Sequence, residues 1–169
     1  MAAITLKGNP INTCGDLPAV GSVGPEFSLT GADLSEVTLD SFRGKNVILS
    51  IVPSFDTPVC ANSVRKFNES VGGSENSVVV NVSMDLPFAQ KRFCESEGLE
   101  HVINLSAFRS PDFGSAYGMT IVDGPLAGLF GRAIVVLNSE GAVTHVELVP
   151  EIAQEPDYDA ALAAVSETN

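Results

Sequence analysis

Residues 46–60 read NVILSIVPSFDTPVC and join an apolar run to the start of a helical pattern. The first seven are rich in β-branched side chains and end at Pro53, which predicts a strand covered on both faces. Thr57 is a favoured residue at a helix N-cap, and Pro58 is favoured at the first helical position. Apolar side chains then recur at helical spacing, so we expect a helix with Cys60 in its first turn.

The rest of the chain continues this alternation of strands and helices. Residues 77–83 and 133–137 predict two more buried strands, and 142–148 predicts a half-exposed one. The first thirty residues are rich in turn residues that separate short strands such as 4–7 and 26–29, and this stretch predicts an N-terminal β-hairpin.

We therefore expect one α/β domain over residues 1–169, with a central mixed sheet and helices on both faces. Start and stop signals place the helices between the strands. The expected helices are 86–97, capped by Asp85 and stopped by Gly98; a short one capped by Ser110 and Pro111 and ending at Tyr117; and a last one opened by Pro156.

Composition excludes several classes of function. The chain has 169 residues, 44% of them hydrophobic, which is enough for an ordinary core and argues against disorder. Its formal net charge of −12 disfavours nucleic acids and anionic membrane surfaces as partners. Residues 1–8 lack the apolar run of a secretory signal, and no stretch approaches the roughly 18 apolar residues of a membrane span. We expect a cytoplasmic protein.

The three cysteines, Cys14, Cys60 and Cys94, are too few for a disulfide framework. At the N-terminus of a helix, free backbone amides and the helix dipole favour a thiolate, which predicts a reactive Cys60. The alternative is that Cys60 is a small core residue. Cys94 suits a resolving thiol that attacks a sulfenic acid on Cys60. Alternatively, Cys94 is an ordinary buried helix residue.

Arg132 stands directly before the buried run 133–137. A guanidinium at the edge of a buried strand needs an anionic partner, and a thiolate would serve. A salt bridge to one of the many carboxylates is the alternative. His101 and His145 show no zinc-like spacing with the cysteines, and no glycine-rich phosphate-binding motif is present, so we expect neither a metal nor an organic cofactor.

Pro53, Thr57 and Cys60 match a P-x-x-x-T-x-x-C motif. Together with DLPFAQKRFC downstream, the run PSFDTPVCANSVRKFN resembles the thiol peroxidase branch of the peroxiredoxins, the atypical two-cysteine type. The resemblance continues through NLSAFRSPDFGSAYG, DGPLAGLFGRAIVVL and EPDYDAAL, and so extends over essentially the whole chain.

This resemblance implies a thioredoxin-like fold with an N-terminal β-hairpin extension, usually as a homodimer. Phe55, where an aliphatic residue is expected, and Cys14, which matches no family role, depart from the pattern. The implied roles are peroxidatic cysteine for Cys60, resolving cysteine for Cys94, hydroxyl residue for Thr57, active-site arginine for Arg132 and shielding proline for Pro53.

The activity implied is that of an antioxidant oxidoreductase. It reduces hydrogen peroxide and organic hydroperoxides to water and alcohols through a sulfenic acid on Cys60. An intramolecular disulfide with Cys94 follows, and a thioredoxin-type reductant restores the dithiol. A non-enzymatic peroxide sensor or redox-switched holdase is the alternative from another class, and a purely structural domain is a third.

Overall fold

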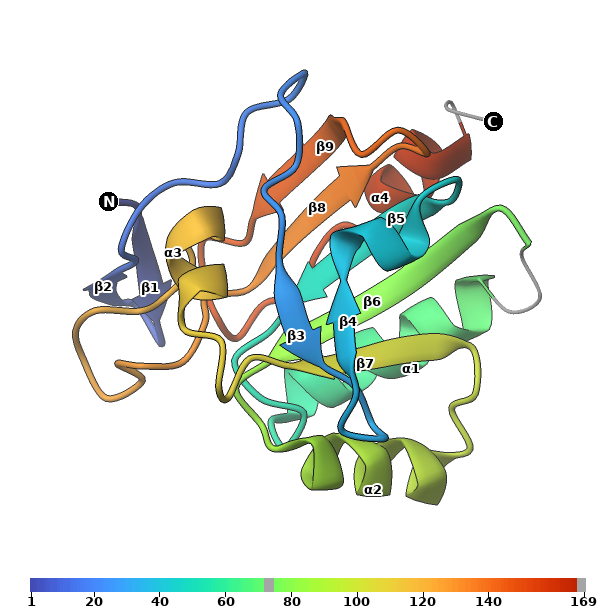
Figure 1. The fold of residues 1–169 in the computed structure, drawn as a ribbon. Coiled ribbons are helices and arrows are strands. Elements are labelled where there is room, and N and C mark those ends of the chain that lie inside the picture. Colours follow the sequence, from blue (N-terminus) through green and yellow to red (C-terminus); the bar gives the residue numbers. More distant parts are fainter. Residues whose placement is uncertain (72–74, 167–169) are drawn as a thin grey trace.

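The computed structural model describes residues 1–71 and 75–166. One mixed sheet has the strand order β4-β3-β7-β6-β5-β8-β9, and β1 and β2 form a separate antiparallel hairpin (Figure 1). This arrangement confirms the α/β class and the N-terminal hairpin. The strands are β1 (Ala3–Leu6), β2 (Asn9–Asn12), β3 (Ser28–Thr30), β4 (Glu36–Thr38), β5 (Asn46–Ile51), β6 (Ser77–Ser83), β7 (Val102–Ser106), β8 (Ala133–Leu137) and β9 (Val143–Leu148). The helices are the 3-10 helix η1 (Leu39–Phe42) and the α-helices α1 (Pro58–Val71), α2 (Pro87–Glu97), α3 (Asp112–Tyr117) and α4 (Tyr158–Ser166).

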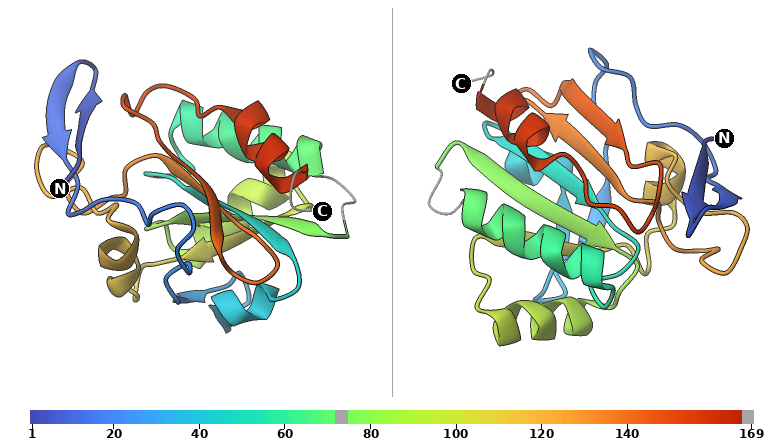
Figure 2. Two further views of the ribbon diagram at one scale, coloured as in Figure 1. Left: turned by 90° about the horizontal axis from the view of Figure 1, so that it is seen from above. Right: turned by 180° about the vertical axis from the view of Figure 1, so that it is seen from behind.

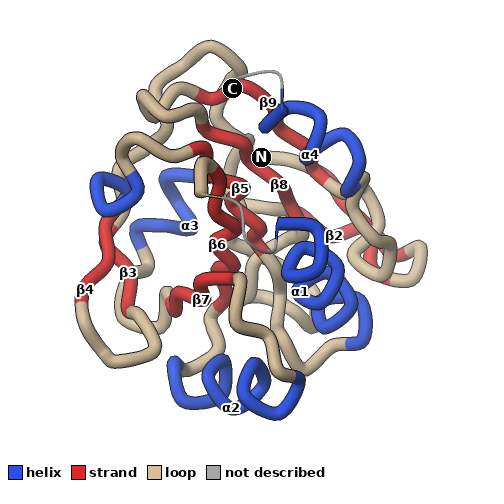
Figure 3. Tube along the Cα trace, turned by 90° about the vertical axis from the view of Figure 1, so that its right-hand side faces the viewer, coloured by secondary structure: helices blue, strands red, loops and turns tan. Residues whose placement is uncertain are grey.

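Helices cover both faces of the sheet. Helices α1 and α4 lie on one face, whereas α3 and η1 lie on the other, and α2 lies beside α1 (Figures 2 and 3). Successive side chains of a strand point to opposite faces, so β5 contributes Val47 and Leu49 to one hydrophobic cluster and Ile48 to the other. In the described part of the chain, no helix is both long and apolar enough to cross a membrane.

The pairing of the central strand β5 with its two neighbours brings three segments of the chain together at one edge of the sheet. All six residues of β5 are buried, as the apolar run predicts. Ile51, its last residue, pairs with Val82 of the parallel strand β6 and with Ala133 of the antiparallel strand β8. The segments that follow β5 and β6, and the residue that precedes β8, therefore meet at the same edge.

Helix α2 departs from the prediction at its start. It begins at Pro87 with Leu86 as its N-cap, so Asp85 is not the cap. The carboxylate of Asp85 instead accepts a hydrogen bond from the hydroxyl of Ser83 at 2.7 Å, and it also binds the chain after β5. The stop at Gly98 is confirmed, because its backbone adopts the left-handed conformation that glycine allows.

Other boundaries differ by a few residues. The last helix begins at Tyr158 and not at Pro156, because the carboxylate of Asp157 accepts the amide of Ala160 and caps it. The strand expected at 26–29 lies at Ser28–Thr30. Strands β2, β4 and β7 and helix η1 lack the continuous apolar runs that mark β5, β6 and β8, and the sequence did not predict them.

Candidate active site

Cys60 is the third residue of α1 and is fully buried. The carbonyl of Thr57 accepts the amide of Ala61, so Thr57 stands directly before the first helical turn, as expected. Its hydroxyl turns back and donates to the carbonyl of Ser54 at 2.9 Å. Because a hydroxyl has one proton, this bond leaves Thr57 with lone pairs to offer to other groups.

Arg132 reaches Cys60 from the neighbouring strand. It precedes Ala133, whose pairing with Ile51 brings it to the end of β5. Its Nη1 donates to Sγ of Cys60 at 3.1 Å, and its Nε donates to the carbonyl of Ile152 at 3.0 Å. The side chain is 2% exposed, and no carboxylate in the described residues forms an ion pair with it. The sulfur of Cys60 thus takes the place of the alternative salt bridge.

The segment that binds Arg132 is itself attached to the N-terminal hairpin. The carboxylate of Glu151 accepts hydrogen bonds from the hydroxyl of Thr5 at 2.5 Å and from the amides of Lys7 and Gly8 at 2.9 and 3.1 Å. These bonds lower the pKa of Glu151 to about 2, and the bond from Thr5 has the largest effect. The hairpin therefore supports the backbone next to Ile152.

Cys94 lies on the buried side of α2. Its Sγ accepts a hydrogen bond from Nδ2 of Asn104 at 2.8 Å, and Oδ1 of Asn104 accepts one from Asn81 at 3.1 Å. The two amides stand opposite each other on β6 and β7. Burial raises the pKa of the Cys94 thiol, and the bond from Asn104 acts in the opposite direction. In this closed arrangement burial therefore favours the protonated form of the Cys94 thiol.

Both thiols belong to one small hydrophobic cluster and are free. Phe55 joins the loop before α1 to α2, because its ring meets that of Phe93 edge-on at a centroid distance of 5.7 Å. Such a pair contributes about 0.5–1.5 kcal/mol beyond simple burial. An aromatic side chain at position 55 therefore packs against the second helix. The buried members of the cluster are Val52, Phe55, Cys60, Val64 and Cys94.

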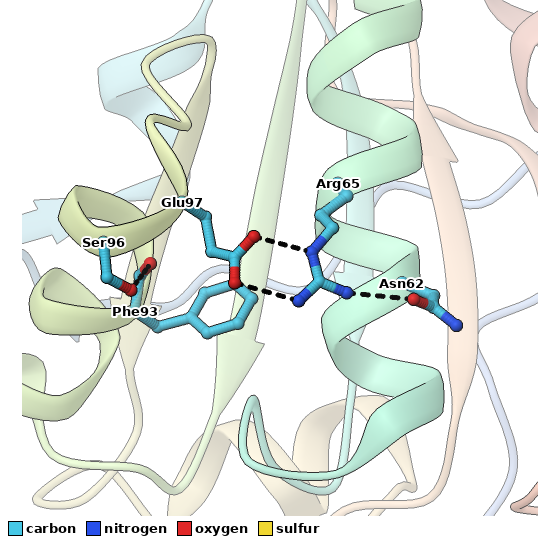
Figure 4. A network of polar contacts seen from close by, with 5 residues as sticks. All are labelled: Asn62, Arg65, Phe93, Ser96 and Glu97. Carbon is cyan, nitrogen blue, oxygen red and sulfur yellow. Dashed lines mark hydrogen bonds and ion pairs between the residues drawn. The ribbon is translucent and has the colours of Figure 1, made fainter.

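A polar contact also bridges α1 and α2 (Figure 4). Arg65 of α1 binds Glu97 of α2 through two hydrogen bonds of 2.9 and 3.0 Å and donates a third to Asn62 at 2.9 Å. Its guanidinium carbon lies 5.7 Å from the centre of the Phe93 ring. The ion pair lowers the pKa of Glu97 and raises that of Arg65. The two cysteine-bearing helices are thus held together from their solvent side.

Of the remaining residues that the sequence singled out, Pro53 lies at the candidate site and Cys14 does not. Pro53 is buried directly after β5, in the loop that leads to Cys60. Cys14 is exposed, lies outside the cluster that contains the other two cysteines, and donates to the carbonyl of Gly114 at 3.4 Å. Among the residues described, no three His, Cys, Asp or Glu side chains are grouped closely enough to hold a metal ion.

Two side chains at this site had no functional role in the sequence-based prediction. Asp85 binds the loop before α1, and Asn104 binds Cys94. The motif DLPFAQKRFC contains Asp85, but a local pattern indicated only a helix cap there. Asn104 lies in a strand that the sequence did not predict.

A buried cysteine in the first turn of a helix, reached by a buried guanidinium at the edge of a central mixed sheet, is typical of thiol-based redox proteins with a thioredoxin-like fold. The Redoxin family matches residues 19–162. Thiol peroxidases from Mycobacterium tuberculosis and Mycobacterium bovis are each 62% identical over 165 residues, which is 98% of this chain and 99% of theirs.

Solved structures agree with this comparison. The chain superposes on a peroxiredoxin-like protein from Aquifex aeolicus with a TM-score of 0.94 and 42% identity, over 100% of this chain and 98% of that one. A thiol peroxidase from Chromobacterium violaceum has the same fold, with a TM-score of 0.89 and 22% identity over 98% and 95% of the two chains. The chain belongs to the Redoxin family and, within it, to the thiol peroxidase branch of the peroxiredoxins.

Proposed function

We propose that residues 1–169 form one thiol-dependent peroxidase domain in which Cys60 is the peroxidatic cysteine. The observation that carries this proposal is the 3.1 Å contact from Nη1 of Arg132 to Sγ of Cys60, both buried at the start of α1. The guanidinium balances a thiolate and presents further donors in a fixed plane. The 62% identity to curated thiol peroxidases supports the same activity.

In the first step, the thiolate of Cys60 attacks one oxygen of a hydroperoxide. An electron pair from sulfur forms the S–O bond as the O–O bond breaks, and the departing alkoxide or hydroxide takes up a proton. Arg132 stabilises the charge that develops on oxygen, and Thr57, whose proton is held by Ser54, accepts the O–H of the substrate. Pro53 shields the sulfur from water. The products are a sulfenic acid on Cys60 and an alcohol or water.

In the second step, Cys94 is the resolving cysteine. Its thiolate attacks the sulfur of the sulfenic acid, a disulfide forms, and hydroxide leaves to become water. Because the pKa of Cys94 is raised by burial in the closed arrangement, this step requires part of α2 to open. A thioredoxin-type dithiol then reduces the disulfide and is itself oxidised. No metal or organic cofactor takes part in these steps.

The protein acts in the cytoplasm as a homodimer in antioxidant defence. Three large apolar side chains near the active-site end are exposed: Leu86 (50%), Phe88 (65%) and Phe108 (39%). The segments that carry them are joined by the hydrogen bond from Ser106 to the carbonyl of Asp85 at 2.5 Å. Exposed apolar surface of this kind favours association with a second copy of the chain.

Replacement of each cysteine tests the proposal. Cys60→Ser should abolish peroxide turnover, because an alcohol does not replace a thiolate at neutral pH. Cys94→Ala should still form the sulfenic acid with one molecule of peroxide, and a second molecule of peroxide should then oxidise it to the sulfinic acid. Cys14→Ala should behave like the parent. Intact mass and non-reducing electrophoresis after one equivalent of peroxide should show an intramolecular Cys60–Cys94 disulfide at monomer mobility. Retained turnover in Cys60→Ser would disprove the assignment.

Steady turnover separates the enzyme from the non-enzymatic alternative. A sensor or holdase would be oxidised by peroxide but would turn over poorly with thioredoxin and its reductase. The thiol peroxidase relatives favour the enzyme, and repeated cycling with that couple is the expected result.

A further inference from the structure

The loop 53–57, which leads from β5 to the helix of Cys60, is hydrogen-bonded to the carboxylate of Asp85. Oδ1 of Asp85 accepts the hydroxyl of Ser54 at 2.7 Å, and Oδ2 accepts the amide of Phe55 at 2.9 Å. Ser54 in turn holds the hydroxyl of Thr57 through its carbonyl and the amide of Asp56 through its own hydroxyl. The position of Thr57 therefore depends on Asp85, although the two side chains share no hydrogen bond in the structure.

Asp85 is itself anchored to the sheet and to α2. Its Oδ2 also accepts the hydroxyl of Ser83 at 2.7 Å, and its carbonyl accepts the hydroxyl of Ser106 at 2.5 Å. Gln90, a fully buried residue of α2, donates to Ser83 and to the carbonyl of Leu105, both at 3.0 Å. One connected set of hydrogen bonds thus runs from the loop before Cys60 to the helix that carries Cys94.

This connection depends on the order of the strands. Strands β5 and β6 are parallel neighbours, so the loop after β5 and the turn after β6 leave the sheet at the same edge. Asp85 occupies that turn, between the last residue of β6 and the first residue of α2. It is half-buried, and its carboxylate binds three neutral donors and forms no ion pair with the described residues. Bonds from such donors to a charged acceptor are stronger than those between neutral groups.

We propose that Asp85 is a positioning residue that holds the loop 53–57 in the arrangement that reduces peroxide, and that it thereby sets the balance between peroxide reduction and disulfide formation. The inference rests on the proposed function. While the carboxylate holds Ser54 and Phe55, Thr57 keeps its place directly before α1 and Cys60 keeps its contact with Arg132. In the proposed second step, part of α2 opens before Cys94 reaches Cys60. Movement of α2 away from the loop 53–57 breaks the bonds to Asp85. Asp85 therefore favours the first step and opposes the second.

The test compares Asp85→Asn with the parent in a rapid-quench experiment. Intact mass resolves the thiol, sulfenate, disulfide and sulfinate forms after a single addition of hydrogen peroxide. We expect sulfenate to form about tenfold more slowly, because a charged acceptor of the loop is lost. We expect the sulfenate to convert to the disulfide faster than in the parent. For the same amount of sulfenate formed, the variant should therefore accumulate less sulfinate than the parent. The readout is the ratio of the two rates, measured under conditions in which circular dichroism shows the variant to be as fully folded as the parent.

Asp33→Asn is the matched control. Asp33 is an exposed carboxylate that accepts two hydrogen bonds from Ser35, and among the described residues it accepts none from the loop 53–57. Its removal should leave both rates unchanged. Ser54→Ala removes one of the bonds to Asp85 and keeps the other two, so it should shift the ratio in the same direction by a smaller factor. The double variant should differ from the sum of the single effects, because both changes break one shared bond.

Several outcomes would overturn the inference. An unchanged ratio in Asp85→Asn, or a fall of both rates by the same factor, would leave Asp85 with a structural role alone. If Asp85→Asn does not fold, judged by its circular dichroism, Ser54→Ala decides, and a parental ratio in that variant rejects the inference. If the parent itself forms no sulfenate on Cys60, the proposed function has failed instead, and the two failures are distinguishable.

Discussion

Nη1 of Arg132 and Sγ of Cys60 lie 3.1 Å apart although 72 residues separate them in the chain. The second donor, Nε, holds the carbonyl of Ile152 and so fixes the plane of the guanidinium. Arg132→Lys keeps the charge but loses this planar set of donors. We expect the second-order rate of peroxide reduction to fall roughly 10- to 100-fold with the fold intact.

Competition kinetics against a peroxidase of known rate would measure this effect. Arg43→Lys is a suitable control, because Arg43 is exposed and, among the described residues, its side chain pairs with Asp40 three residues earlier. It should match the parent. Parental activity in Arg132→Lys would assign Arg132 a structural role.

Glu151 links the N-terminal hairpin to the backbone that binds Arg132. In Glu151→Gln the bonds to Thr5, Lys7 and Gly8 weaken, so amides of β1 and β2 should exchange faster with solvent. We expect peroxide reduction to slow by roughly two- to tenfold through the displaced carbonyl of Ile152. Faster exchange with a parental rate would show that the hairpin does not support the active site.

The pH dependence of Glu151 follows from its pKa, which lies below the ordinary value of 4.5, at about 2. A lowered pKa in the folded state adds stability that is present above about pH 4.5 and is lost as the pH falls toward 2. The difference in urea midpoint between the parent and Glu151→Gln should therefore shrink over that range. A constant difference would contradict the assignment.

Cys94 should destabilise the folded protein at alkaline pH. Its pKa is raised above the ordinary value of 9.0, mainly by burial. A raised pKa in the folded state means that stability is fully present below the ordinary value and is lost as the pH rises past it. Under reducing conditions, the urea midpoint should fall more steeply above pH 9 for the parent than for Cys94→Ser. Asn104→Leu should raise the pKa of Cys94 further, because it removes the amide donor. Parallel curves for the parent and Cys94→Ser would refute this prediction.

The ion pair between Arg65 and Glu97 should help to hold the end of α2 against α1. Because both side chains are more than one third exposed, the effect should be small and screened by salt. In Glu97→Gln, amide exchange in the last turn of α2 should rise at low salt. Since the pKa of Glu97 is lowered in the folded protein, its contribution is lost as the pH falls below about 4.5.

Glu95→Gln offers a matched control for Glu97→Gln. Glu95 lies on the same helix but pairs with Lys91 of that helix at 3.9 Å, so its loss should not release α2 from α1. Equal exchange rates in the two variants would mean that the bridge to Arg65 has no influence on α2.

The sequence predicted the elements whose side chains are buried on both faces. Residues 77–83 and 133–137 match β6 and β8, because continuous β-branched runs leave little alternative to a central strand. Strand β7 escaped prediction because Asn104 and Ser106 interrupt its apolar pattern. Asn104 binds Cys94, and Ser106 binds the carbonyl of Asp85. The polar residues that prevented the prediction of this strand are therefore the ones that contact the candidate site.

At the site, local patterns placed Cys60 in the first turn of a helix but left open whether Arg132 binds its sulfur or a carboxylate. Arg132 comes close only through the pairing of β5 with β8, and residue spacing carries no information on that register. The prediction for Asp85 was wrong for a related reason. An acidic residue before a helix predicts a cap, whereas its bonds here reach Phe55, 30 residues earlier in the chain.

The register of α2 makes the position of Cys94, the proposed resolving thiol, depend on the length of the turn between β6 and α2. Pro87, Gln90 and Cys94 form the buried stripe of this helix. Each residue advances an α-helix by about 100°, so one residue inserted between Asp85 and Pro87 would swing Cys94 well away from that stripe while leaving every cysteine present in the sequence. Homologues that keep both thiols but vary the length of this turn would therefore have to resolve the sulfenic acid by another route. Insertions and deletions at this turn are therefore a stricter guide to the proposed mechanism than the cysteine count.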